Sequence, residues 1–147
     1  MIEINASELV IVAQLLLSSI LGGAIGFVRE RDKKAAGLRT HTLVCVGSTL
    51  LMMISIFMSV KFPGSDAGRI AAQVVTGIGF LGAGTILHAG GAIKGLTTAA
   101  SIWVASAIGL AVGCGFYTAA IACTLIVLII IEVLHKVEQR YIREKDL

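Results

Sequence analysis

The sequence predicts an all-α fold, a polytopic transmembrane helical bundle. Of the 147 residues, 56% are hydrophobic and only 14% are charged, whereas water-soluble domains carry about 25% charged residues. The charges are also clustered, and four long runs contain no Lys, Arg, Asp or Glu: residues 9–28, 40–60, 70–93 and 95–131. Because a helix of about 20 apolar residues crosses the roughly 30 Å core of a bilayer, we expect these runs to lie in a membrane.

The lengths of these runs set the number of spans. The first three are long enough for one crossing each, but residues 95–131 would form a straight helix of about 55 Å, at about 1.5 Å per residue. That run must fold back, and Gly113-Cys114-Gly115 offers a flexible point. We therefore predict that residues 1–147 form one transmembrane domain of about five spans, at residues 9–28, 40–60, 68–89, 96–112 and 116–134. Residues 135–147 would form a cytoplasmic tail.

The basic residues predict that the N-terminus lies outside and the C-terminus inside. Cytoplasmic loops of membrane proteins carry the excess of Lys and Arg. With five spans, ten of the twelve basic residues fall on the side of the first loop and the tail, and only Lys61 and Arg69 fall on the other side. A single crossing by the last run would separate the two basic clusters, so we reject it. The N-terminal segment lacks a basic leader, and we do not expect a cleaved signal peptide.

Gly77-x-Gly79-x-x-Gly82 has the spacing of a dinucleotide-binding loop. That loop follows a strand and is followed, about 20 residues later, by an acidic residue for the ribose. Here the glycines lie inside an apolar run, and no Asp or Glu occurs between Asp66 and Glu132. We therefore expect no nucleotide partner. The net charge of +3 is explained by cytoplasmic loops that meet anionic membrane lipids, so we expect no nucleic acid either.

Small residues at every third or fourth position indicate close helix packing instead. Helices in a bilayer associate through small side chains that let backbones approach. The residues that we expect to pack helices are Gly22, Gly26, Gly77, Gly79, Gly82, Gly84, Ser101, Ala105, Gly109 and Gly113. Most simply, they pack the helices of one chain. Alternatively, the ladder of the first or fourth span forms a homodimer seam, or the glycines of the third span break that helix, as in transporters.

Four polar side chains recur every three or four residues at the start of the third span: Asp66, Arg69, Gln73 and Thr76. Ionisable groups near the hydrocarbon are costly and are candidates for function. If the helix begins near residue 65, all four share one face, and Asp66 and Arg69 form an i, i+3 ion pair. This arrangement is either a capped helix start whose exposed ion pair contributes little, or a polar pocket that opens to the outer face. In both cases Gln73 needs a partner from another span.

Arg39 and His41 open the second span on the inner side. A histidine at this depth either senses pH or hydrogen-bonds a headgroup or a backbone carbonyl. Trp103 lies well inside the predicted fourth span, and its indole N–H needs a protein partner. We therefore expect Trp103 to face the bundle.

The residues that carry enzymatic chemistry do not form a recognisable set in this sequence. It has no pair of carboxylates within the spans, no His/Cys spacing typical of a metal site, and no nucleophile with an evident base and orienting acid. Cys45, Cys114 and Cys123 lie in or beside spans without a CxxC pair. We expect no enzyme activity, no catalytic residue, no metal site and no cofactor.

Three segments of the chain closely resemble the MgtC/SapB family: GLRTHTLV (37–44), DAGRIAAQVVTGIGFLGAGTI (66–86) and KGLTTAASIWVASAIGLAVGCGFY (94–117). The resemblance implies a multi-pass protein of the bacterial cytoplasmic (inner) membrane. It also implies a link to magnesium homeostasis and, in this virulence-associated family, to survival inside host macrophages. Asp66, Arg69 and Gln73 match polar positions of the family, and Arg39 and His41 match its signature after the first loop. Longer members add a soluble C-terminal domain, which we do not expect here.

The residues favour a regulatory role over magnesium transport. Mg²⁺ seeks carboxylate oxygens and gives up its water reluctantly, and Asp66 is the one carboxylate between the first loop and Glu132. We therefore expect a regulatory or interaction protein of the adaptation to magnesium limitation or stress. The alternative is an oligomeric channel or transporter for Mg²⁺ or another cation, with Asp66, Arg69 and Gln73 at its outer mouth. The expected partners are membrane lipids, further copies in a homodimer or other homo-oligomer, and another membrane protein complex.

Overall fold

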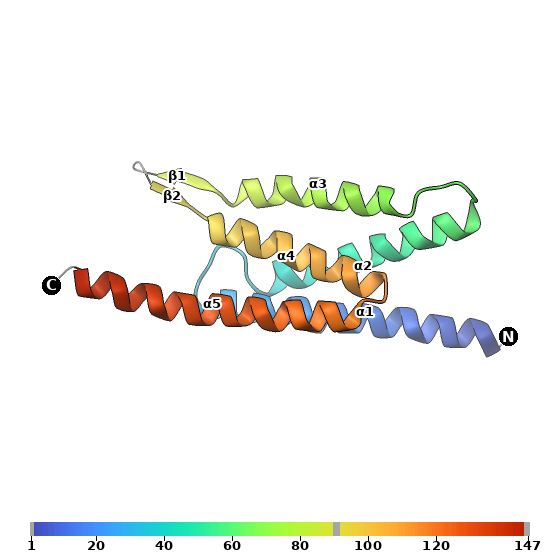
Figure 1. Ribbon diagram of the computed structural model, residues 1–147, viewed down its shortest axis with the longest axis horizontal. Helices are drawn as coiled ribbons and strands as arrows, with labels where there is room; N and C mark the ends of the chain where they lie inside the picture. Colours follow the sequence, from blue (N-terminus) through green and yellow to red (C-terminus); the bar gives the residue numbers. More distant parts are fainter. Residues whose placement is uncertain (1, 90–91, 146–147) are drawn as a thin grey trace.

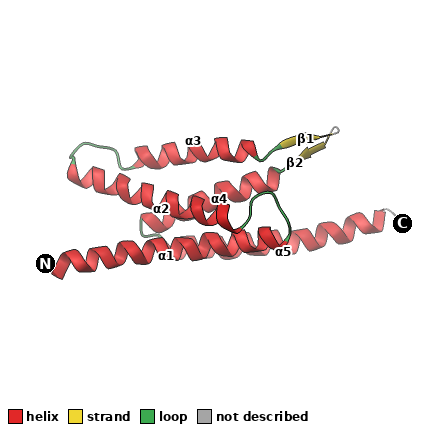
Figure 2. Ribbon diagram, turned by 180° about the vertical axis from the view of Figure 1, so that it is seen from behind, coloured by secondary structure: helices red, strands yellow, loops and turns green. Residues whose placement is uncertain are grey.

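The computed structural model describes residues 2–89 and 92–145 as an up-and-down arrangement of helices with one short hairpin (Figure 1). Each helix runs antiparallel to the one before it. The elements within the described residues are α1 (Ile2–Arg31), α2 (Leu38–Lys61), α3 (Gly68–Gly84), β1 (Leu87–Ala89), β2 (Ala92–Lys94), α4 (Leu96–Gly113) and α5 (Tyr117–Lys145). Helix makes up nearly all of the molecule, and the hairpin lies at one end (Figure 2).

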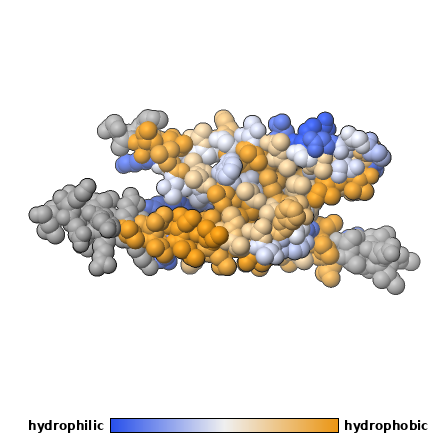
Figure 3. Space-filling model, in the orientation of Figure 1, coloured by the Kyte–Doolittle hydropathy of each residue, from blue (hydrophilic) through white to orange (hydrophobic). Residues whose placement is uncertain are grey.

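Membrane-spanning character is confirmed for this bundle. By length and composition, four helices in the described part of the chain can cross a membrane: Glu8–Arg31, Leu38–Lys61, Leu96–Gly113 and Tyr117–Leu134. Large apolar side chains remain exposed on these helices, for example Leu9 and Leu43, each 71% exposed. Apolar residues cover most of the face in Figure 3, and hydrophilic ones gather over the beginning of α3. Such a surface suits lipid rather than water.

The third helix is shorter than predicted. α3 is continuous over 17 residues but ends at Gly84, not at residue 89. It is about 25 Å long at about 1.5 Å per residue, slightly less than a bilayer core. Thr85 is the C-cap, and the following residues pair as a hairpin in which Leu87 lies opposite Lys94. The apolar run therefore continues beyond the helix because it includes the first strand.

The predicted reversal lies between α4 and α5. The N–H of Gly115 donates to the carbonyl of Val112 at 3.0 Å, and that of Phe116 donates to Ala111 at 2.8 Å. With Gly115 at a φ of +84°, these bonds make a Schellman motif, in which a left-handed residue closes the helix. The last apolar run therefore forms two helices, as its length predicts.

An ion pair places the first loop beside the last helix. Arg31, at the end of α1, lies 2.6 Å from a carboxylate oxygen of Glu132 in α5. The α1–α2 loop, the hairpin and the end of α5 all lie toward the same end of the bundle (Figure 1). We call this the basic end, because Arg29, Lys34 and Lys94 lie there. The opposite end carries the N-terminus of α1 and the α2–α3 loop.

α2 lies between α1 and α4 at van der Waals distance. A Cβ added at Gly22 of α1 would lie 2.6 Å from the Cβ of Cys45, and one added at Gly109 of α4 would lie 2.2 Å from the carbonyl oxygen of Cys45. Thr49 strengthens the second contact, since its hydroxyl donates to the Gly109 carbonyl at 2.8 Å. The surrounding core consists of Leu21, Ile25, Cys45, Ile108, Val112 and Ala120. The grooves of α1 and α4 are thus filled by α2 of the same chain.

Candidate functional site

The polar residues at the start of α3 do not form the predicted ion pair. α3 begins at Gly68 rather than near residue 65, so Asp66 precedes the helix and lacks the i, i+3 helical geometry with Arg69. Its carboxylate instead accepts the Gly68 N–H at 2.7 Å, which satisfies one of the unpaired donors at the helix start. Among the described residues no ion pair joins Asp66 to Arg69, and both side chains are exposed.

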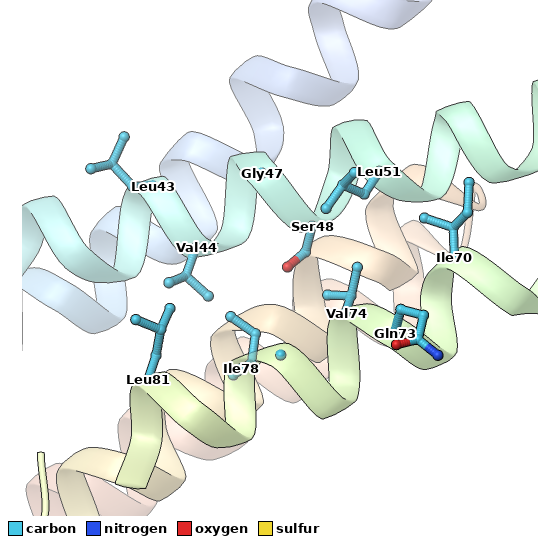
Figure 4. Close-up of a pocket in the computed structure, with 11 residues that line it drawn as sticks. Leu43, Val44, Gly47, Ser48, Leu51, Ile70, Gln73, Val74, Ile78 and Leu81 are labelled. Carbon is cyan, nitrogen blue, oxygen red and sulfur yellow. The ribbon is translucent and has the colours of Figure 1, made fainter. Parts of the chain in front are cut away.

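Gln73 and Thr76 also lie apart from Asp66. The Thr76 hydroxyl donates to the Ala72 carbonyl at 3.1 Å, within its own helix. Gln73 lies on the rim of a groove of about 530 Å³ between α2 and α3 (Figure 4). The groove is lined by Leu43, Val44, Gly47, Ser48, Leu51, Ile70, Gln73, Val74, Gly77, Ile78 and Leu81. Of the two arrangements that the sequence left open, the geometry therefore favours the exposed polar helix start, without its ion pair, over one polar pocket; the groove beside it is separate and mainly apolar.

His41 lies in a buried polar cluster near the basic end. Its Nδ1 is 2.8 Å from the Gly37 carbonyl oxygen, and its Nε2 is 3.0 Å from the Ser101 hydroxyl. The Ser101 hydroxyl itself donates to the Thr98 carbonyl at 2.8 Å. The histidine is completely buried, so it links α2 to α4 and has no contact with solvent. Arg39, the other predicted residue of this region, is exposed and lies outside the cluster.

Arg29 is the residue that sequence reasoning missed. We counted it among the loop charges, but it is only 3% exposed, and its guanidinium donates to the Thr98 hydroxyl. A signal was present in the sequence, since Gly22, Gly26 and Arg29 follow at i, i+4 and i+7 and therefore share one helix face. The face that packs closely against α2 thus ends in a buried cation.

Trp103 faces outward, contrary to expectation. Its side chain is 50% exposed, whereas Ile102 and Ala105 on the same helix are buried. The small residues of α4 turn one face toward α2, and Trp103 falls on the other side of the helix. The indole of Trp103 therefore lies on the outer surface of the bundle and is not packed between its helices.

The described residues contain no group of three or more His, Cys, Asp or Glu side chains that could hold a metal ion. Asp66, at the end of the bundle opposite the basic end, is exposed and accepts a hydrogen bond from the backbone. Polar groups inside the helices, such as Ser48 and Ser106, bond each other at 2.9 Å.

Comparison with known proteins gives this chain clear relatives. Residues 15–140 match the MgtC family model. The chain is 46% identical over 134 residues to the putative magnesium transporter YhiD of Escherichia coli, a match that covers 88% of this chain and 62% of that protein. It is 41% identical over 129 residues to protein MgtC of Salmonella typhimurium, covering 88% and 54%.

An uncharacterized protein of Haemophilus influenzae is 40% identical over 149 residues, covering 97% of this chain and 62% of that protein. The chain thus spans less than two thirds of the length of these relatives. No solved structure matches it.

Proposed function

The chain belongs to the MgtC family, and we propose that it is a regulatory protein of the bacterial inner membrane that acts in adaptation to low magnesium through helix contacts. Its N-terminus lies outside and its basic end faces the cytoplasm, following the excess of basic residues. The observation that carries the proposal is the outward face of α3.

α3 has one packed side and one open side, which borders the groove to α2 at Gly77. Val74, Ile78 and Gly82 are buried, and a Cβ added at Gly82 would meet Ala99 of α4 at 3.6 Å. At Gly77 and Gly84, by contrast, an added Cβ would meet no atom within 4 Å. Small residues gain nothing from contact with lipid tails, whereas they let a second helix approach closely. The open side is therefore suited to a helix from another chain.

Gln73 supports the same conclusion independently. It lies one turn before Gly77, where the open side of α3 borders the groove to α2, and among the described residues its exposed amide makes no hydrogen bond. Moving an amide from water into an apolar environment without a hydrogen bond costs about 2 to 7 kcal/mol, depending on the transfer scale. An amide both donates and accepts, so two Gln73 side chains can pair across a two-fold axis, where the same surface meets itself. We therefore assign the open side to a second copy of this chain.

The proposed dimer is tested by photo-crosslinking in native membranes. A photoreactive phenylalanine at Phe80, which is 83% exposed on α3, is compared with one at Phe27, which is 61% exposed on α1. We expect a product of twice the mass from position 80 and none from position 27. Equal yields at both positions, or no product of that mass, would overturn the α3 dimer.

The regulatory role requires a target besides the second copy. Affinity purification after crosslinking at Trp103, which is 50% exposed on α4, provides the test. We expect one other membrane protein in products from cells grown at low magnesium. Products that contain only this chain, at Trp103 and at other exposed positions, would contradict a regulatory role.

Transport is the second candidate, because the relative YhiD is called a putative magnesium transporter and Asp66 is exposed at the predicted outer end. An α3 dimer would bring two Asp66 carboxylates to one mouth. We expect purified full-length protein in liposomes to move no Mg²⁺, K⁺ or H⁺. Magnesium flux that Asp66→Asn abolishes, and that Asp32→Asn at the basic end does not, would establish transport instead.

A further inference from the structure

Arg29 is an incompletely satisfied cation inside the basic end. Its side chain is 3% exposed, and one terminal nitrogen donates to the Thr98 hydroxyl. Its Nε is buried and has no hydrogen-bond partner among the described residues. Because a guanidinium carries five N–H donors and a buried donor without an acceptor is costly, the side chain has capacity for a further acceptor.

A cavity of about 610 Å³ lies beside Arg29, between the α1–α2 loop, the start of α4 and the middle of α5. We call it the Arg29 cavity. It is lined by Arg29, Asp32, Lys34, Ile93, Gly95, Leu96, Thr97, Thr98, Ile130, Ile131 and Leu134. Polar groups of α1 and α4 therefore face apolar side chains of β2 and α5 across one space.

The start of α4 adds further donors to this cavity. Its N-cap is Gly95, with a φ of +96° and no side-chain hydrogen bond to the helix. The first N–H groups of a helix lack acceptors within the helix, and the helix dipole places partial positive charge there. Leu96, Thr97 and Thr98, which supply these groups, all line the cavity. The start of the 18-residue helix α4 and the buried Arg29 side chain thus face the same cavity.

The charges around the cavity favour an anion. Arg29 and Lys34 contribute two positive charges, and Asp32 contributes one negative charge. Asp32 is itself paired with Arg31, whose Nε lies 3.1 Å from its carboxylate. Arg29 offers the planar fork that suits phosphate oxygens, and the α4 start offers backbone donors of the kind that bind phosphate elsewhere.

We infer that the Arg29 cavity binds a phosphate group. The same chemistry is carried by an anionic phospholipid headgroup and by free inorganic phosphate. The apolar wall formed by Ile130, Ile131 and Leu134 suits acyl chains, and basic pockets between helices on the cytoplasmic side bind anionic lipids. We therefore expect the lipid to be the stronger ligand.

The test uses delipidated, full-length protein in neutral detergent and follows its thermal unfolding by the fluorescence of Trp103. Three probes are titrated: dioleoyl phosphatidylglycerol, dioleoyl phosphatidylcholine and inorganic phosphate. Because a ligand that binds only the folded state raises the unfolding temperature, we expect a saturable rise with phosphatidylglycerol that exceeds the rise with phosphatidylcholine. A saturable rise with inorganic phosphate alone would identify a soluble anion as the source and still support the phosphate site.

Two neighbouring lysines provide a matched pair of variants. Lys34 lines the cavity, whereas Lys33 is not among its lining residues, and both are exposed. Lys34→Gln should weaken the apparent affinity by about tenfold, as expected when one charge-assisted hydrogen bond is lost, and Lys33→Gln should leave it unchanged. Arg29→Lys, which keeps the charge but removes the Nε–H, should also weaken binding.

Two results would overturn the site. One is the absence of a saturable rise with both phosphatidylglycerol and phosphate. The other is an equal loss in Lys33→Gln and Lys34→Gln, which would mean that general surface charge attracts the lipid. Because Lys34 is exposed, its variant tests the site even if Arg29→Lys fails to fold.

Discussion

The glycines of α1 and α4 and the glycines of α3 have similar spacings in the sequence but different surroundings. At Gly22, Gly26, Gly109 and Gly113, an added Cβ would lie within 2.7 Å of an atom of α2 or of the loop before it. At Gly77, Gly79 and Gly84 it would meet nothing within 4 Å. The first group holds one chain together, whereas the second makes no close contact within that chain. Residue type alone therefore does not show which contact a glycine serves.

The strongest test of this difference is a large side chain in the α2–α4 contact. Gly109→Leu would place its Cβ 2.2 Å from the Cys45 carbonyl oxygen, where backbone on both sides leaves no room. We expect a loss of more than about 3 kcal/mol in stability, seen as little or no folded protein in size-exclusion chromatography after extraction. The matched variant Gly79→Leu should remain folded. A folded, stable Gly109→Leu protein would refute the assigned contact.

A smaller change at the α1–α2 contact should still be measurable. Gly22→Ala would bring its methyl group within 2.6 Å of the Cys45 side chain, so the two helices would have to move apart. We expect it to destabilise the fold by about 2 kcal/mol, measured as a lower denaturation midpoint. A midpoint equal to that of the unchanged protein would mean that α1 shifts freely over α2.

Gly115→Ala tests a glycine that is needed for its backbone angle instead of its size. The φ of +84° is unfavourable for a residue with a Cβ, while an added Cβ would meet no neighbour within 4 Å. We expect destabilisation by about 1 to 2 kcal/mol. Gly115→Asn, which tolerates this conformation better, should recover part of the loss. No difference between the two variants would argue against a conformational cause.

Gly77→Ala should change the stability least, and it should raise the stability where the other substitutions lower it. Alanine favours a helix over glycine by about 0.5 to 1 kcal/mol, and the added methyl group has open space. In detergent dilute enough to dissociate the proposed dimer, we expect a slightly higher denaturation midpoint. Destabilisation under those conditions would show that Gly77 contacts something within its own chain.

The number of helices followed from the lengths of the apolar runs, because the thickness of a bilayer fixes how much apolar chain a crossing needs, but in the described part of the chain four of them, and not α3, are long and apolar enough to cross a membrane. The fold-back at Gly115 followed for the same reason. The end of α3 could not be predicted in this way. The strand residue Leu87 is as apolar as the residues of a transmembrane helix, and its pairing with Lys94 depends on residues further along the chain. Hydropathy reports that a segment avoids water, but not whether it is helix or strand.

The polar residues were harder to place than the spans. Arg29 and its partner Thr98 are 69 positions apart in the sequence, so only the packing of α1 against α4 brings them together. The position of Asp66 depended on a helix start that differs by three residues from the predicted residue 65 to Gly68. Because of that small difference, the Asp66 carboxylate accepts the Gly68 N–H and makes no ion pair with Arg69.

The burial of Cys45 between two glycines makes this thiol an indicator of bundle opening. It is 0% exposed, whereas Cys114 and Cys123 are partly accessible. A maleimide reagent would reach Cys45 only when α1 or α4 moves away from α2. The rate at which Cys45 is alkylated, relative to Cys114 and Cys123, therefore reports how often α1, α2 and α4 separate in the membrane of intact cells.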